Sequence, residues 1–226
     1  MIKVLRFGLW LMALLPVFAW AATANNAASS NGFVQGKDYQ IIQAATAPAS
    51  PLPAGKIQVI EFFNYGCPAC NHFEPALEKW LANGKPKDVA FERVPVVFHP
   101  EWDILARAYY VAKDLGVEGK ITPVIFDAIH QQGLDLSTQA ALAKFFEKNG
   151  VKEQDFNSAF QFSPGIDAQM MRGENLMGVY QVFEIPTLVI NGKYKTNLGM
   201  AGGDGQRMVQ IADYLIAKAR QDMKKA

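Results

Sequence analysis

Two cysteines separated by two residues are the only cysteines in the chain, and this spacing has a clear chemical meaning. They lie in Cys67-Pro68-Ala69-Cys70. Apolar side chains recur at helical spacing after this segment, and Pro68 suits the first position of a helix, where no backbone N–H is needed. Cys67 would then lie at the positive end of a helix, which lowers the pKa of a thiol. We predict that Cys67 is an exposed nucleophile and that Cys70 lies one turn behind it, within disulfide reach.

Other interpretations of the cysteine pair fit less well. A zinc site needs further cysteines or histidines, but no second pair is present and only His72 of the three histidines is close in sequence. Covalent haem attachment requires histidine directly after the second cysteine, where this chain has Asn71. A structural disulfide that closes so short a loop would stabilise the fold little. The sequence therefore favours thiol–disulfide exchange, without metal or cofactor.

Strand patterns lie on both sides of a long helical block. A short apolar run before the cysteines is typical of a strand covered on both faces. Asn191-Gly192 predicts a tight hairpin turn, and Pro95 predicts a bulge or a strand end. Three prolines predict an irregular connection over residues 44–55. The predicted strands are 38–43 at a sheet edge, 57–63, 89–98, 187–190 and 193–196.

The helical block runs from Glu101 to about Gly178, and Asp204 is expected to cap a final helix. Flanking strands and helices with a helical block between them predict an α/β domain interrupted by an all-helical one. The predicted helices of the block are 104–115, 123–132, 137–149, 153–160 and 166–177.

The N-terminus has the pattern of a secretory signal peptide. Lys3 and Arg6 precede an apolar run that ends in small residues, and this run is shorter than the roughly 20 apolar residues of a membrane span. We predict a signal peptide at residues 1–22 and a flexible leader at 23–35. Export would place the cysteines where disulfides persist. Loss of Lys3 and Arg6 changes the formal net charge from +1 to −1, which gives no electrostatic basis for nucleic-acid binding.

Several separated motifs together resemble the DsbA family of periplasmic thiol:disulfide oxidases. The similarity extends from about Gly36 to the C-terminus and includes the helices after residue 118. It implies a thioredoxin fold at residues 36–98 and 175–226, with a helical domain inserted at 99–174. The motifs are Glu61-Phe62-Phe63, Cys67-Pro68-Ala69-Cys70, Leu115-Gly116-Val117-Glu118, Ile185-Pro186-Thr187 and Asn191-Gly192-Lys193-Tyr194.

The resemblance also implies roles for residues away from the cysteines. It implies a cis peptide bond before Pro186 that faces the cysteine pair, with Ile185 offering backbone hydrogen bonds to an extended substrate. An acid in an apolar strand is costly to ionise unless paired, and Glu61 is expected to move the proton of the buried thiol, to pair with Arg93, or both. Pro68 and Ala69 would tune the redox potential. Ala69 departs from the histidine of the best-known members and cannot donate a hydrogen bond.

The expected function is that of a dithiol oxidase that donates its disulfide to reduced exported proteins in the periplasm. The family implies reoxidation by a quinone-linked membrane protein of the DsbB type. A periplasmic reductase or isomerase is the alternative within redox chemistry, because Ala69 leaves the potential open. A non-catalytic, chaperone-like peptide-binding module is the alternative of another class, although both cysteines are present.

Overall fold

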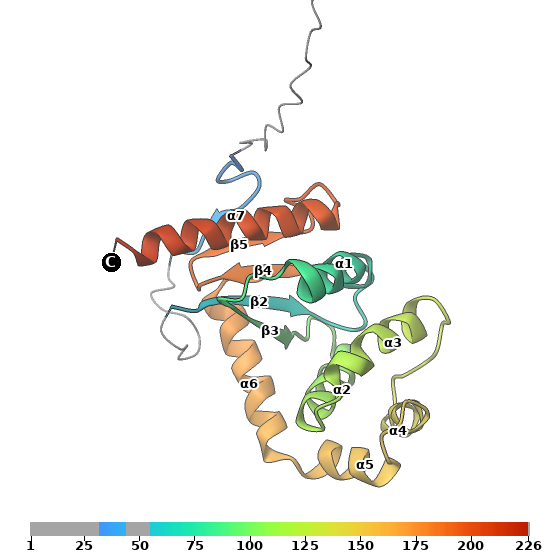
Figure 1. Cartoon of the computed structure of the whole chain (residues 1–226). Helices are drawn as coiled ribbons and strands as arrows, with labels where there is room; N and C mark the ends of the chain where they lie inside the picture. Colours follow the sequence, from blue (N-terminus) through green and yellow to red (C-terminus); the bar gives the residue numbers. More distant parts are fainter. Residues whose placement is uncertain (1–31, 44–54, 226) are drawn as a thin grey trace, which may run out of the picture. The chain divides into compact units, whose positions relative to one another are not determined.

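The computed structural model describes residues 32–43 and 55–225 of the chain. In this part a five-stranded mixed sheet carries helices on both faces, and further helices pack beside one end of it (Figure 1). The predicted signal peptide, the leader up to residue 31 and the irregular connection at 44–54 lie outside the described residues. Among the helices that are described, none is long and apolar enough to cross a membrane.

The sheet has the order β1-β5-β4-β2-β3, so that the strand before the cysteines is internal. β2 pairs in parallel with β3 and antiparallel with β4. Every residue of β2 is buried, as the apolar run predicts for a strand covered on both faces. The strand bounds are β1 (Gln40–Ile41), β2 (Ile57–Phe63), β3 (Val89–Pro95), β4 (Thr187–Ile190) and β5 (Tyr194–Asn197).

The side chains of β2 alternate between two apolar clusters. Ile57 and Val59 pack with α1 (Pro68–Lys79) and α7 (Gly205–Met223), whereas Ile60 and Phe62 pack on the opposite face with α6 (Pro164–Val179). Successive side chains of a strand point to opposite faces. Glu61 therefore shares the face of Ile57 and Val59, beneath the helix that carries the cysteines.

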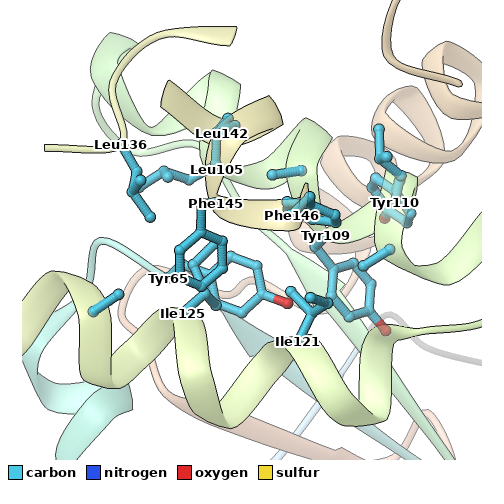
Figure 2. Packing of buried hydrophobic residues seen from close by; sticks show 14 of the residues in the cluster. Tyr65, Leu105, Tyr109, Tyr110, Ile121, Ile125, Leu136, Leu142, Phe145 and Phe146 are labelled. Atoms are coloured by element: carbon cyan, nitrogen blue, oxygen red, sulfur yellow. The ribbon is translucent and has the colours of Figure 1, made fainter. Parts of the chain in front are cut away.

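A third apolar cluster joins the remaining helices to the end of β2. Phe63 and Tyr65 contribute to it from the sheet side, together with both cysteines. Figure 2 shows how Tyr65 and Ile125 meet aromatic and aliphatic side chains from several helices. The remaining helices and helical turns are η1 (Trp80–Gly84), which directly follows α1, and, between β3 and β4, η2 (Pro100–Trp102), α2 (Asp103–Asp114), α3 (Glu118–His130), α4 (Gln139–Lys148) and α5 (Glu153–Phe162).

Most predicted elements are present, with some differences at their ends. β3 ends at Pro95, and Asn191-Gly192 forms the predicted turn with positive φ at both residues. The side chain of Asp204 caps α7 as predicted. α3 begins at Glu118 instead of Pro123, because the backbone N–H groups of residues 120 and 121 already donate to the carbonyl of residue 117.

The end of the predicted leader is folded. Phe33 packs edge-on against Tyr214 of α7, with 5.5 Å between the ring centroids. The backbone N–H of Val34 donates to the Asp38 carboxylate at 2.8 Å. The assignment of residues 33–35 to a flexible leader is therefore wrong, because an aromatic side chain among small polar residues finds an apolar partner late in the chain.

Candidate active site

Cys67 is the N-cap residue of α1. Its backbone is extended, Pro68 occupies the first helical position, and the Cys67 sulfur accepts a hydrogen bond from the Cys70 backbone N–H at 3.3 Å. A hydrogen bond from the Cys70 thiol lowers the pKa of Cys67 to about 7, and the backbone N–H groups of Cys70 and Ala69 act in the same direction against the opposing effect of burial. The helix start thus stabilises the thiolate, as the sequence predicts.

The prediction that Cys67 is exposed is wrong. Only 5% of the residue is accessible, and its sulfur lies 3.8 Å from the carbonyl oxygen of Ile185. The Ile185 segment before β4 and the apolar cluster around the helices cover the thiol, and most residues of both lie far from Cys67 in sequence. The Cys67 sulfur is therefore in direct contact with the Ile185 segment.

Cys70 has the opposite electrostatic environment. It is fully buried, and both cysteines are free thiols in this structure. Burial raises the pKa of Cys70 well above its ordinary value, and the nearby Cys67 and Glu61 raise it further. The two thiols therefore differ in acidity: Cys67 ionises readily, whereas Cys70 keeps its proton.

The Ile185–Pro186 peptide bond is cis, as predicted. It directly precedes β4, and β4 pairs with β2, which leads into the cysteine loop. This pairing brings Ile185 to Cys67 across 118 residues of sequence. The Ile185 backbone carbonyl therefore lies beside the Cys67 sulfur.

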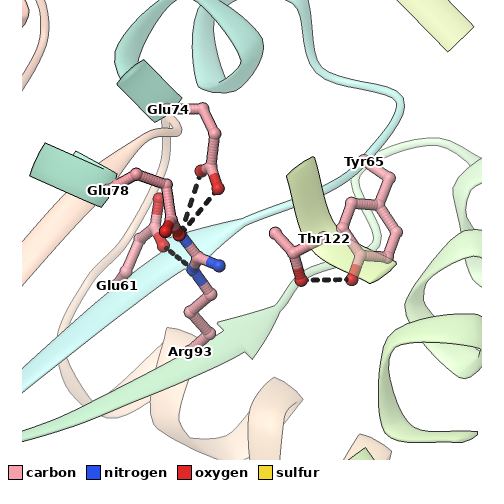
Figure 3. A network of polar contacts seen from close by, with 6 residues as sticks. All are labelled: Glu61, Tyr65, Glu74, Glu78, Arg93 and Thr122. Atoms are coloured by element: carbon pink, nitrogen blue, oxygen red, sulfur yellow. Dashed lines mark hydrogen bonds and ion pairs between the residues drawn. The ribbon is translucent and has the colours of Figure 1, made fainter. Parts of the chain in front are cut away.

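Glu61 belongs to a buried ionic cluster centred on Arg93 (Figure 3). Arg93 lies opposite Glu61 in the β2–β3 register and donates to it at 2.8 Å, so the predicted salt bridge is confirmed. Arg93 also donates to Glu74 at 2.9 Å and to Glu78 at 3.0 Å. Glu61 Oε1 has no hydrogen-bond partner among the described residues.

Two carboxyl groups of this cluster, those of Glu61 and Glu74, are shifted towards their protonated forms. Burial raises the pKa of Glu61, although Arg93 opposes the shift. Burial likewise raises the pKa of Glu74 to about 8. Glu61 is also close enough to raise the pKa of Cys70. A carboxyl group whose burial favours the protonated form, that of Glu61, therefore lies beneath the buried thiol.

Glu74 and Glu78 are residues of the site that the sequence analysis missed. They follow Cys70 at intervals of four, which places all three on one face of α1. This spacing could have identified them, because a helix face that carries the buried thiol of Cys70 is expected to pack on the sheet. Pro68 and Ala69 lie at the start of α1, as predicted, where the Ala69 side chain offers no hydrogen bond.

The loop before Cys67 is tightly held. The Asn64 side chain donates to the carbonyl oxygen of Val96 at 2.8 Å and accepts from the Gly66 N–H at 2.9 Å. A Cβ atom on Gly66 would lie 2.7 Å from Nε1 of Trp102, so only glycine fits without rearrangement. Across residues 32–43 and 55–225, no group of three or more histidine, cysteine or acidic side chains is arranged to hold a metal ion.

Comparison with known proteins gives one consistent result. Residues 89–215 match the model of the DSBA-like thioredoxin domain family. The thiol:disulfide interchange protein DsbA of Azotobacter vinelandii is 39% identical over 185 residues, which cover 82% of this chain and 84% of that protein. DsbA of Pseudomonas aeruginosa strain PAO1 is 35% identical over 214 residues, which cover 95% and 99%.

Solved structures agree with these relatives. The crystal structure of Pseudomonas aeruginosa DsbA superposes with a TM-score of 0.77 at 35% identity, covering 86% of this chain and 98% of that one. The oxidoreductase DsbA from Xylella fastidiosa gives a TM-score of 0.75 at 36% identity, covering 83% and 98%. The predicted thioredoxin-like fold with a helical insertion is confirmed. The chain belongs to the DsbA family of thiol:disulfide oxidoreductases.

Proposed function

We propose that this protein is a dithiol oxidase in which Cys67 is the nucleophilic and leaving sulfur and Cys70 is the resolving one. The observation that carries the proposal is the position of Cys67 at the start of α1, where the Cys70 thiol and backbone N–H groups stabilise its thiolate. A sulfur that leaves readily as a thiolate makes its disulfide a good oxidant. Stabilisation of the reduced form therefore drives electrons from substrate to enzyme.

The reaction begins from the Cys67–Cys70 disulfide. A substrate thiolate attacks the Cys67 sulfur, the Cys67–Cys70 bond breaks, and its electron pair passes to Cys70, which takes up a proton. A second substrate thiolate then attacks the substrate sulfur of the mixed disulfide and displaces Cys67 as a thiolate. The substrate loses two electrons and gains a disulfide, and the enzyme is left as the dithiol.

Glu61 is proposed to exchange the proton of Cys70. Its carboxyl group is fully buried on the α1 side of β2, its pKa is raised by burial, and it influences the pKa of Cys70. Glu61→Gln should slow the step in which Cys70 is protonated or deprotonated. If Glu61 only pairs with Arg93, Glu61→Gln should lower the stability of the fold and leave the pH profile of that step unchanged. Single-turnover kinetics across pH distinguish the two roles.

Ile185 and Pro186 are proposed to bind the substrate chain. The carbonyl oxygen of Ile185 lies beside the Cys67 sulfur, and an extended peptide can pair with this backbone while its cysteine reaches Cys67. The expected substrates are reduced exported proteins in the periplasm, and a quinone-linked DsbB-type membrane protein is the expected oxidant. The signal-peptide pattern of residues 1–22 supports this location.

We also retain the proposed division of the chain into a thioredoxin-like part at residues 36–98 and 175–226 and a helical insertion at 99–174. The helices from η2 to α6 lie between β3 and β4 in the chain. α6 crosses the second boundary: Ile166 packs with the helical cluster, whereas Leu176 packs beneath the sheet.

A direct test is oxidative refolding of a reduced, unfolded protein that contains disulfides. The oxidised wild-type protein should accelerate disulfide formation, and Cys67→Ser should abolish this activity. Cys70→Ser cannot form the Cys67–Cys70 disulfide, so it should also be inactive towards the reduced substrate. Its Cys67 thiolate should instead attack a substrate that already contains a disulfide and stay joined to it as a mixed disulfide, because the resolving thiol is gone. If Cys67→Ser still assists refolding as well as the wild type, the chain is a peptide-binding module and the oxidase proposal is wrong.

A reductase is the second candidate, and Ala69 is the residue that favours it. The helix start lacks a side-chain donor or positive charge between Pro68 and Cys70. A less stabilised thiolate makes a weaker oxidant. The reduction potential separates these two functions.

A further inference from the structure

Three residues of α3 contact different parts of Tyr65. Thr122, Phe126 and His130 follow each other at intervals of four, so they lie on one face of the helix. The hydroxyl groups of Thr122 and Tyr65 are 2.9 Å apart (Figure 3), and the Phe126 ring packs edge-on against the Tyr65 ring at 5.3 Å. Nε2 of His130 lies 2.8 Å from the backbone carbonyl oxygen of Tyr65. One face of α3 therefore holds the hydroxyl, the ring and the backbone of a single residue.

The contact with the backbone has a defined direction. A carbonyl oxygen can only accept a hydrogen bond, so His130 donates from Nε2. The imidazole also stacks on Phe126, with 6.0 Å between ring centroids and an interplanar angle of 29°. His130 is half-buried and Tyr65 is buried, so loss of the donor from His130 would leave the Tyr65 carbonyl oxygen without this hydrogen bond and destabilise the fold.

The carbonyl that His130 holds belongs to the peptide unit before Gly66. The N–H of that unit donates to the Asn64 side chain, and the Cys67 N–H donates to the Asn64 carbonyl oxygen at 3.1 Å. His130 and Asn64 therefore fix one peptide unit from two sides. If the bond from His130 is lost, only Asn64 still holds this unit, so the unit can tilt and Cys67 can shift relative to the Cys70 N–H that donates to its sulfur.

We propose that His130 is a positioning residue for Cys67: with Thr122 and Phe126 it clamps Tyr65, and its own hydrogen bond to the Tyr65 carbonyl, rather than the contacts of the other two with the Tyr65 side chain, fixes the turn that places Cys67 at the start of α1. The inference deepens the proposed function, because it rests on Cys67 as the reacting sulfur. It assigns the helical insertion a part in the chemistry, since α3 reaches the cysteine loop across 65 residues of sequence.

The test compares two substitutions of His130 in the full-length protein. His130→Phe keeps an aromatic ring over Phe126 but has no donor, whereas His130→Gln keeps an N–H donor. Ultraviolet absorbance of the thiolate in the reduced protein gives the pKa of Cys67, and glutathione equilibria give the reduction potential. We expect His130→Phe to raise the Cys67 pKa by about half to one unit and to make the potential more reducing. His130→Gln should restore most of both values.

Thr122→Val is the matched control, because it loosens the same clamp at the hydroxyl end of Tyr65. It should lower the melting temperature and leave the Cys67 pKa close to that of the wild type. If His130→Phe does not fold, His130→Met provides the donor-free variant. The inference is overturned if a folded donor-free variant keeps the wild-type pKa and potential, or if the Gln or Val variant shifts both as far as the donor-free one.

The thiol titration also separates this inference from the proposed function. It needs only reduced, folded protein and no oxidase activity. A wild-type protein that fails to oxidise substrates but shows the His130-dependent shift would contradict the proposed function and leave the clamp supported.

Discussion

The stability of the reduced protein relative to the oxidised protein should increase between pH 6 and pH 8. The pKa of Cys67 falls from its ordinary value of 9.0 in the unfolded chain to about 7 in the folded protein. A group whose pKa is lowered by folding stabilises the fold above its unfolded pKa, and this contribution is lost as the pH falls through the folded value. The disulfide form has no ionisable thiol, so the effect belongs to the reduced form alone.

The magnitude follows from the two pKa values. Linkage between about 7 and 9 gives the reduced form about 1.3 kcal/mol more stability relative to the oxidised form at pH 8 than at pH 6. Cys70 does not contribute in this window, because its raised pKa acts only near and above pH 9. Glu74 titrates near pH 8 and lowers stability as the pH rises, but it is present in both redox forms and cancels in the difference.

Urea unfolding of both redox forms at several pH values measures this difference. Cys67→Ala, unfolded under reducing conditions, is the control: its pH dependence should follow that of the oxidised wild type. A difference between reduced and oxidised protein that stays constant from pH 6 to pH 8 would refute the claim that α1 and Cys70 stabilise the Cys67 thiolate.

Three further substitutions probe the surroundings of the cysteines. Arg93→Met should destabilise the protein by about 3–5 kcal/mol in urea unfolding at pH 9, where Glu74 is ionised, because the buried carboxylate loses its counter-charge; a loss below about 1 kcal/mol at this pH would contradict the buried ion pair. Gly66→Ala should cost about 1–3 kcal/mol and alter Trp102 fluorescence, since the added Cβ meets the indole; an unchanged spectrum and midpoint would contradict this contact. Ala69→His should lower the Cys67 pKa by about one unit in thiolate titrations, and a pKa that stays at its wild-type value would show that the missing histidine is not what sets it.

The local parts of the site were predictable from sequence. Pro68 after a cysteine and before a helical pattern indicates an N-cap thiol, and this is what Cys67 is. The Glu61–Arg93 ion pair could be predicted because an acid and a base lie in adjacent apolar strands. The cis bond before Pro186 followed only from the family resemblance, since a proline at a strand start is ordinarily trans.

The contacts that cover and tune the cysteines were not predictable, because they join segments far apart in the chain. Burial of Cys67 depends on Ile185, 118 residues away. The sequence does not show that Phe33 is folded, because its partner Tyr214 lies near the other end of the chain. The hold of His130 on the Tyr65 carbonyl arises only when the insertion packs against the cysteine loop.

The reduction potential of the Cys67–Cys70 pair, measured by equilibrating purified protein in glutathione buffers, decides whether the protein acts as an oxidase. We expect a potential well above the value of about −270 mV for thioredoxin, because the chain belongs to the DsbA family and the start of α1 favours the Cys67 thiolate and hence the reduced protein. A potential close to that of thioredoxin would contradict the oxidase assignment and identify the protein as a reductase.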